Sequence, residues 1–190
     1  LSRFPIEKTS YQDWVGKGDC RHIAAQIKGI NIHNIYLPAG GDIPDRDENI
    51  KFGHKLDFVS EVTEYFEQNK PAKSVLVGDL NIAPLAEDVW STNQLRNVVS
   101  HTDIERVNLI AMQERGGWVD AVRDFFGADE RLYSWWSYRA RDYISSNRGR
   151  RLDHVWTSTD LAPQIQKVEI HTNTRGWKQP SDHVPISLQL

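Results

Sequence analysis

The alternation of hydrophobic and polar positions divides the first half of the chain into strands and one long helix. Residues 22–28 and 31–37 are strand-like runs joined at Gly29, a spacing typical of a hairpin. Between residues 49 and 69 the hydrophobic positions recur at steps of three and four, which predicts an amphipathic helix. Its apolar face consists of Phe52, Leu56, Val59, Val62 and Phe66.

The second half of the chain continues the alternation. Three apolar residues, 75–77, predict a short buried strand, and Thr102 or Asp103 is suited to cap a helix that runs to Met112. Irregular chain with a short helix is expected between these elements. Further elements are a helix over residues 118–126 and strands over residues 152–157, 166–171 and 186–190. Because at least one hairpin must be antiparallel, the pattern favours an α/β domain built on a mixed sheet.

Composition limits the class of protein. The chain has 190 residues, enough for one domain with a core, and a formal charge of −3, which argues against a wholly basic nucleic-acid-binding domain but leaves room for a local basic groove. The single Cys20 forbids an internal disulfide and fits a reducing compartment. No apolar run is long enough to span a bilayer, so we expect no membrane partner. The start at Leu1, without a signal peptide or initiator Met, suggests a fragment or a processed chain.

Two oxygen-bearing side chains follow the strand at residues 75–77. Asp79 and Asn81 are two positions apart, and side chains two apart on an extended segment point the same way. A carboxylate and a carboxamide side by side suit a hard divalent cation or an activated water. An ordinary Asp-containing turn would have the same pattern.

Two later segments carry candidate partners for this pair. Asp153 interrupts an apolar strand, where a carboxylate needs a partner: either a neighbouring arginine satisfies it, or it orients a histidine. Prolines at 180 and 185 bracket Ser181-Asp182-His183 and should stiffen it. Asp182 and His183 could then serve as metal ligand and acid or base, although a surface turn would look the same.

Aromatic and basic residues gather between positions 134 and 151. Trp135 and Trp136 precede a set of arginines, which suits a nucleic-acid surface because guanidinium groups bind phosphates and rings meet bases or sugars. The arginines are Arg139, Arg141, Arg148, Arg150 and Arg151. The alternative is a core tryptophan pair beside a solvated loop, and we expect one of the two rings in the core and the other partly exposed.

The motifs, taken in their order along the chain, resemble those of the exodeoxyribonuclease III family of the wider endonuclease/exonuclease/phosphatase superfamily. The resemblance covers nearly the whole chain. Its segments are Tyr36-Leu37-Pro38, Gly78-Asp79-Leu80-Asn81, Trp135-Trp136-Ser137-Tyr138-Arg139, Asn147-Arg148-Gly149, Arg151-Leu152-Asp153 and Ser181-Asp182-His183. The aspartate, asparagine and histidine motifs are shared across the superfamily, whereas the two segments rich in Trp and Arg point to its DNA-repair branch.

The resemblance implies a four-layer α/β/β/α sandwich of two mixed sheets with an active site at one edge. It also implies Mg²⁺ or Mn²⁺ and the hydrolysis of phosphodiester bonds, as a 3′→5′ exodeoxyribonuclease on duplex DNA and an endonuclease at abasic sites. We therefore expect a monomer that acts on double-stranded DNA with abasic sites or 3′ ends, in the cytoplasm and associated with the nucleoid.

By the same resemblance, Asp79 activates or orients the attacking water, and Asp153 orients His183, which contacts the scissile phosphate. Tyr36 positions the phosphate or stabilises the leaving oxygen. The implied metal ligands are Asp79, Asn81, Asp182 and His183, and the implied DNA contacts are Trp135, Trp136, Arg139, Asn147 and Arg148, with Trp136 and Asn147 near the abasic sugar. These roles supply what phosphodiester cleavage needs: a nucleophile, charge stabilisation and help for the leaving group.

The chain departs from the family at its start. The family places a strand with an Asn and a strand with a metal-binding Glu before the segment that matches Leu1, and neither has a counterpart here. We therefore expect residues 1–190 to form a single catalytic domain that lacks its N-terminal strands. Ala39 also replaces the polar residue that many relatives carry after Tyr-x-Pro. Two alternatives remain open: another phosphodiesterase or phosphatase of the superfamily, and a catalytically inactive DNA-binding fragment.

Overall fold

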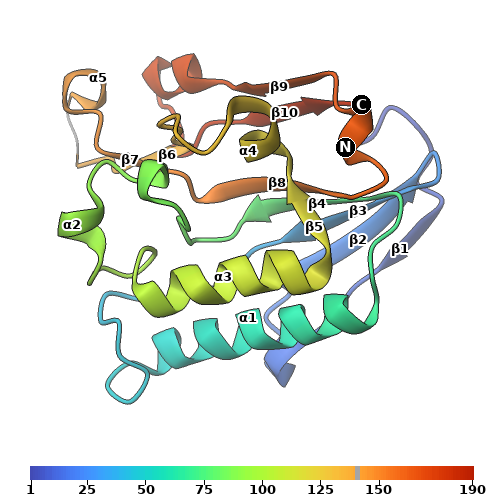
Figure 1. Ribbon diagram of the computed structural model, residues 1–190, viewed down its shortest axis with the longest axis horizontal. Coiled ribbons are helices and arrows are strands. Elements are labelled where there is room, and N and C mark those ends of the chain that lie inside the picture. Colours follow the sequence, from blue (N-terminus) through green and yellow to red (C-terminus); the bar gives the residue numbers. More distant parts are fainter. Residues whose placement is uncertain (140–141) are drawn as a thin grey trace.

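A mixed β-sheet forms the centre of the molecule. The computed structural model describes residues 1–139 and 142–190, and within them the largest sheet has six strands in the order β1-β2-β3-β4-β8-β5 (Figure 1). The strands are β1 (Lys8–Ser10), β2 (His22–Ile27), β3 (Ile30–Ile35), β4 (Ser74–Asp79), β8 (Asp153–Ser158) and β5 (Trp118–Asp120). Only β3 and β4 run parallel; the other neighbours are antiparallel.

Two helices cover one face of this sheet. α1 (Ile50–Gln68) and α3 (Asp103–Gly116) lie side by side across it (Figure 1). Asn49 caps α1, and Thr102 with Glu105 forms a capping box on α3, which satisfies backbone amides that a helix start leaves free. The core between helices and sheet contains Phe58, Val59, Val62, Phe66, Leu76, Leu109, Met112 and Trp156.

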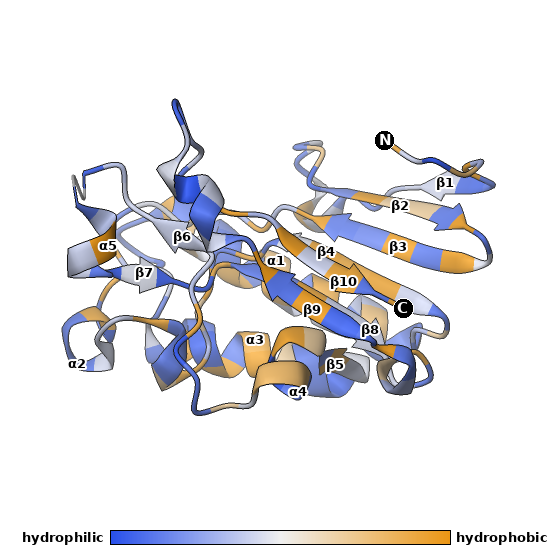
Figure 2. Ribbon diagram, turned by 90° about the horizontal axis from the view of Figure 1, so that it is seen from above, coloured by the Kyte–Doolittle hydropathy of each residue, from blue (hydrophilic) through white to orange (hydrophobic). Residues whose placement is uncertain are grey.

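A second, two-stranded sheet lies on the opposite face. β9 (Lys167–Ile170) and β10 (Ile186–Gln189) pair antiparallel and lie over the β4–β8 part of the large sheet, next to α4 (Ala121–Phe126) (Figure 2). The apolar layer between them contains Val75, Val122, Val155 and Val168. The mixed-sheet α/β sandwich predicted from the sequence is confirmed, with the second sheet represented by these two strands.

Small elements gather at the end of the sheet where β4 stops. β6 (Trp135–Trp136) and β7 (Gly149–Arg150) pair antiparallel there, near α2 (Thr92–Leu95) and α5 (Tyr143–Ser146) (Figure 1). Single-turn 3-10 helices complete the connections: η1 (Trp14–Gly16), η2 (Ala86–Asp88), η3 (Ala162–Gln164) and η4 (Thr172–Gly176). In the described part of the chain, no helix combines the length and apolar character needed to cross a membrane.

One predicted element is wrong in part. Residues 118–126 were expected to form a single helix, but Trp118–Asp120 is strand β5 and pairs with β8, and α4 begins only at Ala121. The Asp120 carboxylate accepts hydrogen bonds from the amides of Val122 and Arg123 and thereby starts the helix. A three-residue edge strand has no periodicity of its own, so only its pairing with β8 identifies it.

Candidate active site

Antiparallel pairing brings two carboxylates together at the end of the sheet. Asp79 ends β4 and Asp153 begins β8, and the two are direct partners in the register. Alternation along the strands places them on the same face as Val75 and Val155, which is the face that β9 and β10 cover. His183 lies in the segment that leads into β10, so it reaches the same place.

A glycine and a left-handed turn shape the Asp79 loop. Gly78 has φ +142°, and a Cβ there would lie 1.9 Å from the carbonyl oxygen of Ile35, so no larger residue fits where β4 lies against the end of its parallel neighbour β3. Asn81 has φ +52°. Its backbone amide and its side-chain Nδ2 donate to the two oxygens of Asp79 at 2.9 and 3.0 Å, and Nδ2 also donates to the Leu37 carbonyl.

Asp153 orients His183 through a short hydrogen bond. Nδ1 of His183 lies 2.8 Å from Oδ2 of Asp153, and a carboxylate can only accept, so the Nδ1 atom carries the proton. The Ser134 hydroxyl donates to the same oxygen at 2.7 Å and accepts from the amides of Leu152 and Asp153. The Nε2 atom of His183 consequently faces Asp79, 4.0 Å from its Oδ2.

The surroundings raise the pKa values of both Asp79 and His183. Burial and the neighbouring charge of Asp153 raise the pKa of Asp79 to about 6. Burial lowers the pKa of His183, but the hydrogen bond and charge of Asp153, together with the charge of Asp79, outweigh it and leave that pKa above its ordinary value. Near neutral pH Asp79 is therefore mostly ionised, and its charge and that of Asp153 favour the protonated form of His183.

The donor set fits a divalent cation. Ligand atoms of Asp79, Asp153 and His183 lie within 4.8 Å of one another. Mg²⁺ is usually held by one or two carboxylates, with waters and substrate phosphates completing its shell. Two carboxylates beside the amide of Asn81 meet that requirement, so the chemistry of these residues is compatible with a hard metal ion.

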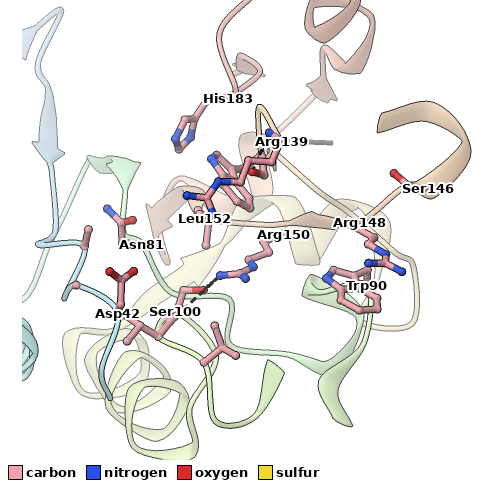
Figure 3. A pocket seen from close by; sticks show the side chains of 16 residues that line it. Asp42, Asn81, Trp90, Ser100, Arg139, Ser146, Arg148, Arg150, Leu152 and His183 are labelled. Atoms are coloured by element: carbon pink, nitrogen blue, oxygen red, sulfur yellow. Dashed lines mark hydrogen bonds between the residues drawn. The ribbon is translucent and has the colours of Figure 1, made fainter. Parts of the chain in front are cut away.

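A cavity of about 930 Å³ opens beside this cluster. Asn81 and His183 line one side of it, and three arginines and two tryptophans line much of the rest (Figure 3). These are Arg139, Arg148, Arg150, Trp90 and Trp135. The Arg150 guanidinium lies 5.3 Å from the ring centre of Trp135, its partner across β6 and β7. The cavity is thus a recess rich in arginine and tryptophan, with Asp42 also in its lining, and it adjoins the cluster through Asn81 and His183.

Among the predicted site residues, Asp79, Asn81, Asp153 and His183 come together, and Trp135, Arg139 and Arg148 line the adjoining cavity. Of the two alternatives for Asp153, an arginine partner or a histidine, the structure has the histidine. Arg151 instead pairs with Asp88 and Asp120, fully buried, and Arg150 donates to the Ser100 hydroxyl and the Val99 carbonyl. Asp153 is left to Ser134 and His183.

Three predicted residues lie apart from the cluster or from the cavity beside it. Asp182 lies outside the three-residue cluster, because its carboxylate accepts the indole N–H of Trp135 at 3.0 Å. Trp136 is buried as the core member of the tryptophan pair, since neighbours on a strand point to opposite faces. Its indole donates to Asn147, and both side chains line a second cavity, of about 780 Å³, rather than the one beside the cluster.

Tyr36 lies close to the cluster through its backbone. The amide of Leu37 donates to the Asp79 carbonyl, while the Tyr36 side chain is 54% exposed and the Arg21 guanidinium lies 5.1 Å from its ring centre. Across the described residues its hydroxyl makes no hydrogen bond with the cluster. Arg141, part of the expected arginine set, lies outside the described residues.

Sequence reasoning missed three groups at this site. Ser134 had no signal of its own, because its role depends on β6 lying beside the start of β8. Trp90, from the segment after η2, had been placed only in irregular chain, yet it lines the cavity. Lys55 is fully buried on α1, and its ammonium donates to the carbonyls of Ala39 and Asn81 and to Glu105, which fixes the loop after β4.

Comparison with known proteins gives consistent matches. A sequence profile described as "Endonuclease/Exonuclease/phosphatase family" matches residues 1–183. An exodeoxyribonuclease of Bacillus subtilis is 37% identical over 88% of this chain and 63% of its own length, and exodeoxyribonuclease III of Haemophilus influenzae is 27% identical over 96% and 68%. The solved structure of an AP endonuclease from Archaeoglobus fulgidus superposes with a TM-score of 0.87 at 29% identity, covering 96% of this chain and 70% of that one. The chain therefore spans about two thirds of the length of these relatives.

Proposed function

The chain belongs to the endonuclease/exonuclease/phosphatase family, and from this premise we propose that it hydrolyses phosphodiester bonds in damaged DNA. The activities proposed are a 3′→5′ exodeoxyribonuclease on duplex DNA and an endonuclease at abasic sites. The observation that carries the proposal is the Asp153–His183 hydrogen bond, which aims Nε2 at Asp79 on the rim of a cavity rich in arginine and tryptophan.

Three residues of the chain, Asp79, His183 and Tyr36, are proposed to act at different points of the reaction. Asp79 accepts a proton from the attacking water, whose oxygen bonds to phosphorus as the bond to the leaving oxygen breaks. His183, held by Asp153, donates through Nε2 to a phosphoryl oxygen and stabilises the charge that develops there. Tyr36, placed next to this loop by the backbone bond of Leu37, is the group proposed to assist the leaving oxygen.

Mg²⁺ or Mn²⁺ is the proposed metal, because carboxylates are hard ligands. Asp79 and Asp153 would hold it together with the amide oxygen of Asn81, whose Nδ2 is already bonded to Asp79 and Leu37. When bound, the ion neutralises charge on the phosphoryl oxygens. The chain's contribution is to hold the two carboxylates together at the start of β8 and the end of β4.

The substrate proposed is double-stranded DNA with abasic sites or 3′ ends. Support comes from Trp135, Arg139 and Arg148 at the cavity, since such groups meet bases and phosphates. They also weigh against a phosphoinositide or sphingomyelin substrate, which offers no base to stack. A monomeric state, a cytoplasmic location with nucleoid association, and a single domain over residues 1–190 remain predictions.

Incision of a duplex with one abasic site tests the proposal. With Mg²⁺ present we expect cleavage beside the site, and we expect Asp79→Asn and His183→Ala each to lower kcat by at least about 100-fold, the scale of a general acid–base or charge-stabilising group. Trp177→Ala, which removes an exposed ring outside the cavity, serves as the control and should keep wild-type activity. Cleavage that is indifferent to the first two substitutions, or turnover of a lipid phosphodiester without DNA cleavage, would contradict the proposal.

A further inference from the structure

Trp90 occupies a position that the proposed reaction does not use. It lines the same cavity as the cluster, but Figure 3 places it with Arg148 on one side and Asn81 and His183 on the other. The Arg148 guanidinium lies 4.7 Å from the ring centre of Trp90, within the range of a cation–π contact. The cavity thus has a second, chemically distinct end, made of an indole and a guanidinium.

Three extended segments hold this indole in place. The amide of Trp90 donates to the carbonyl of Gly149 at 3.2 Å, Val89 forms a β-bridge with Arg150, and Arg150 pairs with Trp135 on the next strand. Trp90 also packs against the buried cluster of Ala83, Val89, Leu95 and Leu152. Because backbone and core both fix the ring, it is presented to the cavity without a large cost in ordering.

The charge between the two ends suits a phosphate chain. Arg150 lies between Trp90 and the cluster in Figure 3, and its guanidinium donates to two neutral oxygens, the Ser100 hydroxyl at 2.7 Å and the Val99 carbonyl at 3.3 Å. Those bonds fix the group without neutralising it; the nearby carboxylates are Glu105, which acts on the guanidinium from the interior, and Asp42 in the cavity lining. A nucleotide strand that has one phosphate at His183 can therefore continue over Arg150 towards Trp90.

The chemistry of this end and the size of the whole cavity favour a single base. A cavity of about 930 Å³ is of the size that encloses one small ligand, whereas a base pair within duplex DNA already has both faces stacked on its neighbours. An unpaired base has free π-faces, and stacking on aromatic and guanidinium planes is the common way in which proteins bind it.

We propose that Trp90 and Arg148 form a stacking subsite for an unpaired nucleobase of the DNA strand whose phosphate lies at His183. This inference rests on the proposed function for the identity of the strand. It means that the chain distinguishes DNA ends by whether a base near the scissile phosphate is free to leave its pair, and that a frayed or mismatched 3′ end is bound more tightly than a fully paired one.

The test compares two labelled duplexes that differ by one nucleobase. Both carry an unpaired nucleotide at the 3′ end; in one the base is present, and in the other the nucleotide is abasic. Dissociation constants are measured by fluorescence anisotropy in EDTA, where no cleavage interferes, for the wild type and the Trp90→Ala, Trp90→Phe, Arg148→Ala and Trp177→Ala variants.

We expect Trp90→Ala to weaken binding of the base-containing duplex by about 5- to 150-fold, the range given by loss of one base–aromatic stack. Binding of the abasic duplex should change little, and Trp90→Phe should restore most of the difference. Arg148, being exposed, can be replaced without risk to folding, and its alanine variant should also lose base selectivity. Trp177→Ala should match the wild type on both duplexes.

Equal losses on the two duplexes in both the Trp90→Ala and Arg148→Ala variants would overturn the subsite, as would no loss on either. The readout is independent of catalysis. Base-selective binding without any cleavage would support the subsite and contradict the nuclease proposal. Mg²⁺-dependent cleavage with no base selectivity would support the nuclease proposal and contradict the subsite.

Discussion

The chemistry of the site depends on two carboxylates, Asp79 and Asp153, and on the histidine that contacts both, His183. Asp79 and Asp153 face each other across β4 and β8, and His183 lies between them with its Nδ1 proton committed to Asp153. Burial makes the ionised form of Asp79 costly, which raises its pKa to about 6 and prepares the carboxylate to accept a proton. Asp79, the group proposed to accept the proton, therefore also lowers the stability of the folded protein when it is ionised.

Asp79→Asn should make the protein more stable and less active. The pKa of Asp79 is about 6 in the folded protein against 3.8 ordinarily, so this carboxyl destabilises the folded state progressively as pH rises from 3.8 to 6 and in full above 6. We expect the free energy of unfolding of the variant to be about 1–2 kcal/mol higher at pH 7.5. The difference between a pKa of about 6 and one of 3.8 corresponds to about 3 kcal/mol, and a weakened hydrogen bond to Asn81 removes part of it. At pH 4.5 Asp79 is protonated in the folded chain but still mostly ionised in the unfolded chain, so the gain should be smaller by about 2 kcal/mol and close to zero. Urea unfolding at the two pH values measures it, and a variant less stable than wild type at pH 7.5 would refute this reading.

At the scale of elements, a buried ion pair links the helices to the site. Lys55 of α1 and Glu105 of α3 are fully buried and lie 2.5 Å apart, and the ammonium also holds the carbonyl of Asn81. The same two helices carry a second pair, Glu67 with Arg115, at the surface. The protein thus contains a buried and an exposed pair between one pair of helices, which allows a matched comparison.

Lys55→Met should lower the free energy of unfolding by about 3–5 kcal/mol, because it leaves Glu105 charged and unpaired in the interior. Arg115→Met should leave that free energy close to wild type, because an exposed pair is screened by water. Both are measured by urea unfolding at pH 7. Similar losses from the two substitutions would show that burial does not govern the strength of these pairs.

Elements with a clear period were predictable, and those defined by distant partners were not. The hydrophobic repeat of residues 49–69 identified α1 to within a residue, and the run before Asp79 identified β4. The two-residue strands β6 and β7, by contrast, exist because Trp135 pairs with Arg150 and Trp136 with Gly149. Those pairings create the cavity wall, so the half of the site that it forms could not be derived from local pattern.

The order of motifs predicted which side chains form the cluster better than it predicted the surroundings of the cluster. Asp79 and Asp153 meet because β4 and β8 are neighbours and pair in register. Asn81 follows Asp79 in the same loop, and His183 reaches Asp153 from the segment before β10. The orientation of Trp136 and Asn147 away from the cavity, and of Asp182 towards Trp135, depends on side-chain packing around β6. Motif identity says nothing about that packing, and Trp90 belonged to no motif at all.

At the scale of the whole molecule, buried neutral histidines should make the fold sensitive to acid. His154 accepts from Arg151 through Nδ1 and donates to the Ile82 carbonyl, and His22 accepts from the Gln12 amide and donates to His33. Both are buried, and burial lowers the pKa of each to about 4, helped by the nearby charge of Arg151 at His154 and by His33 at His22.

Stability should therefore fall as pH drops from about 6.5 to about 4. In that interval the unfolded chain binds protons on these histidines and the folded chain does not, so each group removes up to about 3 kcal/mol. Protonation of Asp79 raises the free energy of unfolding by at most about 3 kcal/mol over part of the same interval. The combined loss from the two histidines is larger, so the net stability falls. Urea unfolding at pH 7, 5.5 and 4.5 measures the trend, and constant or rising stability towards pH 4.5 would contradict it.

The central claim is that Asp79, Asp153 and His183 form a metal-dependent centre for phosphodiester hydrolysis. The most direct measurement is the rate of incision of an abasic-site duplex as Mg²⁺ is titrated from zero, for the wild type and for Asp79→Asn. The account predicts no incision in EDTA, a saturable rise with Mg²⁺ in the wild type, and a much lower plateau at a higher Mg²⁺ requirement in the variant. Salt-sensitive DNA binding with no incision at any Mg²⁺ concentration, or incision that does not depend on the metal, would contradict it.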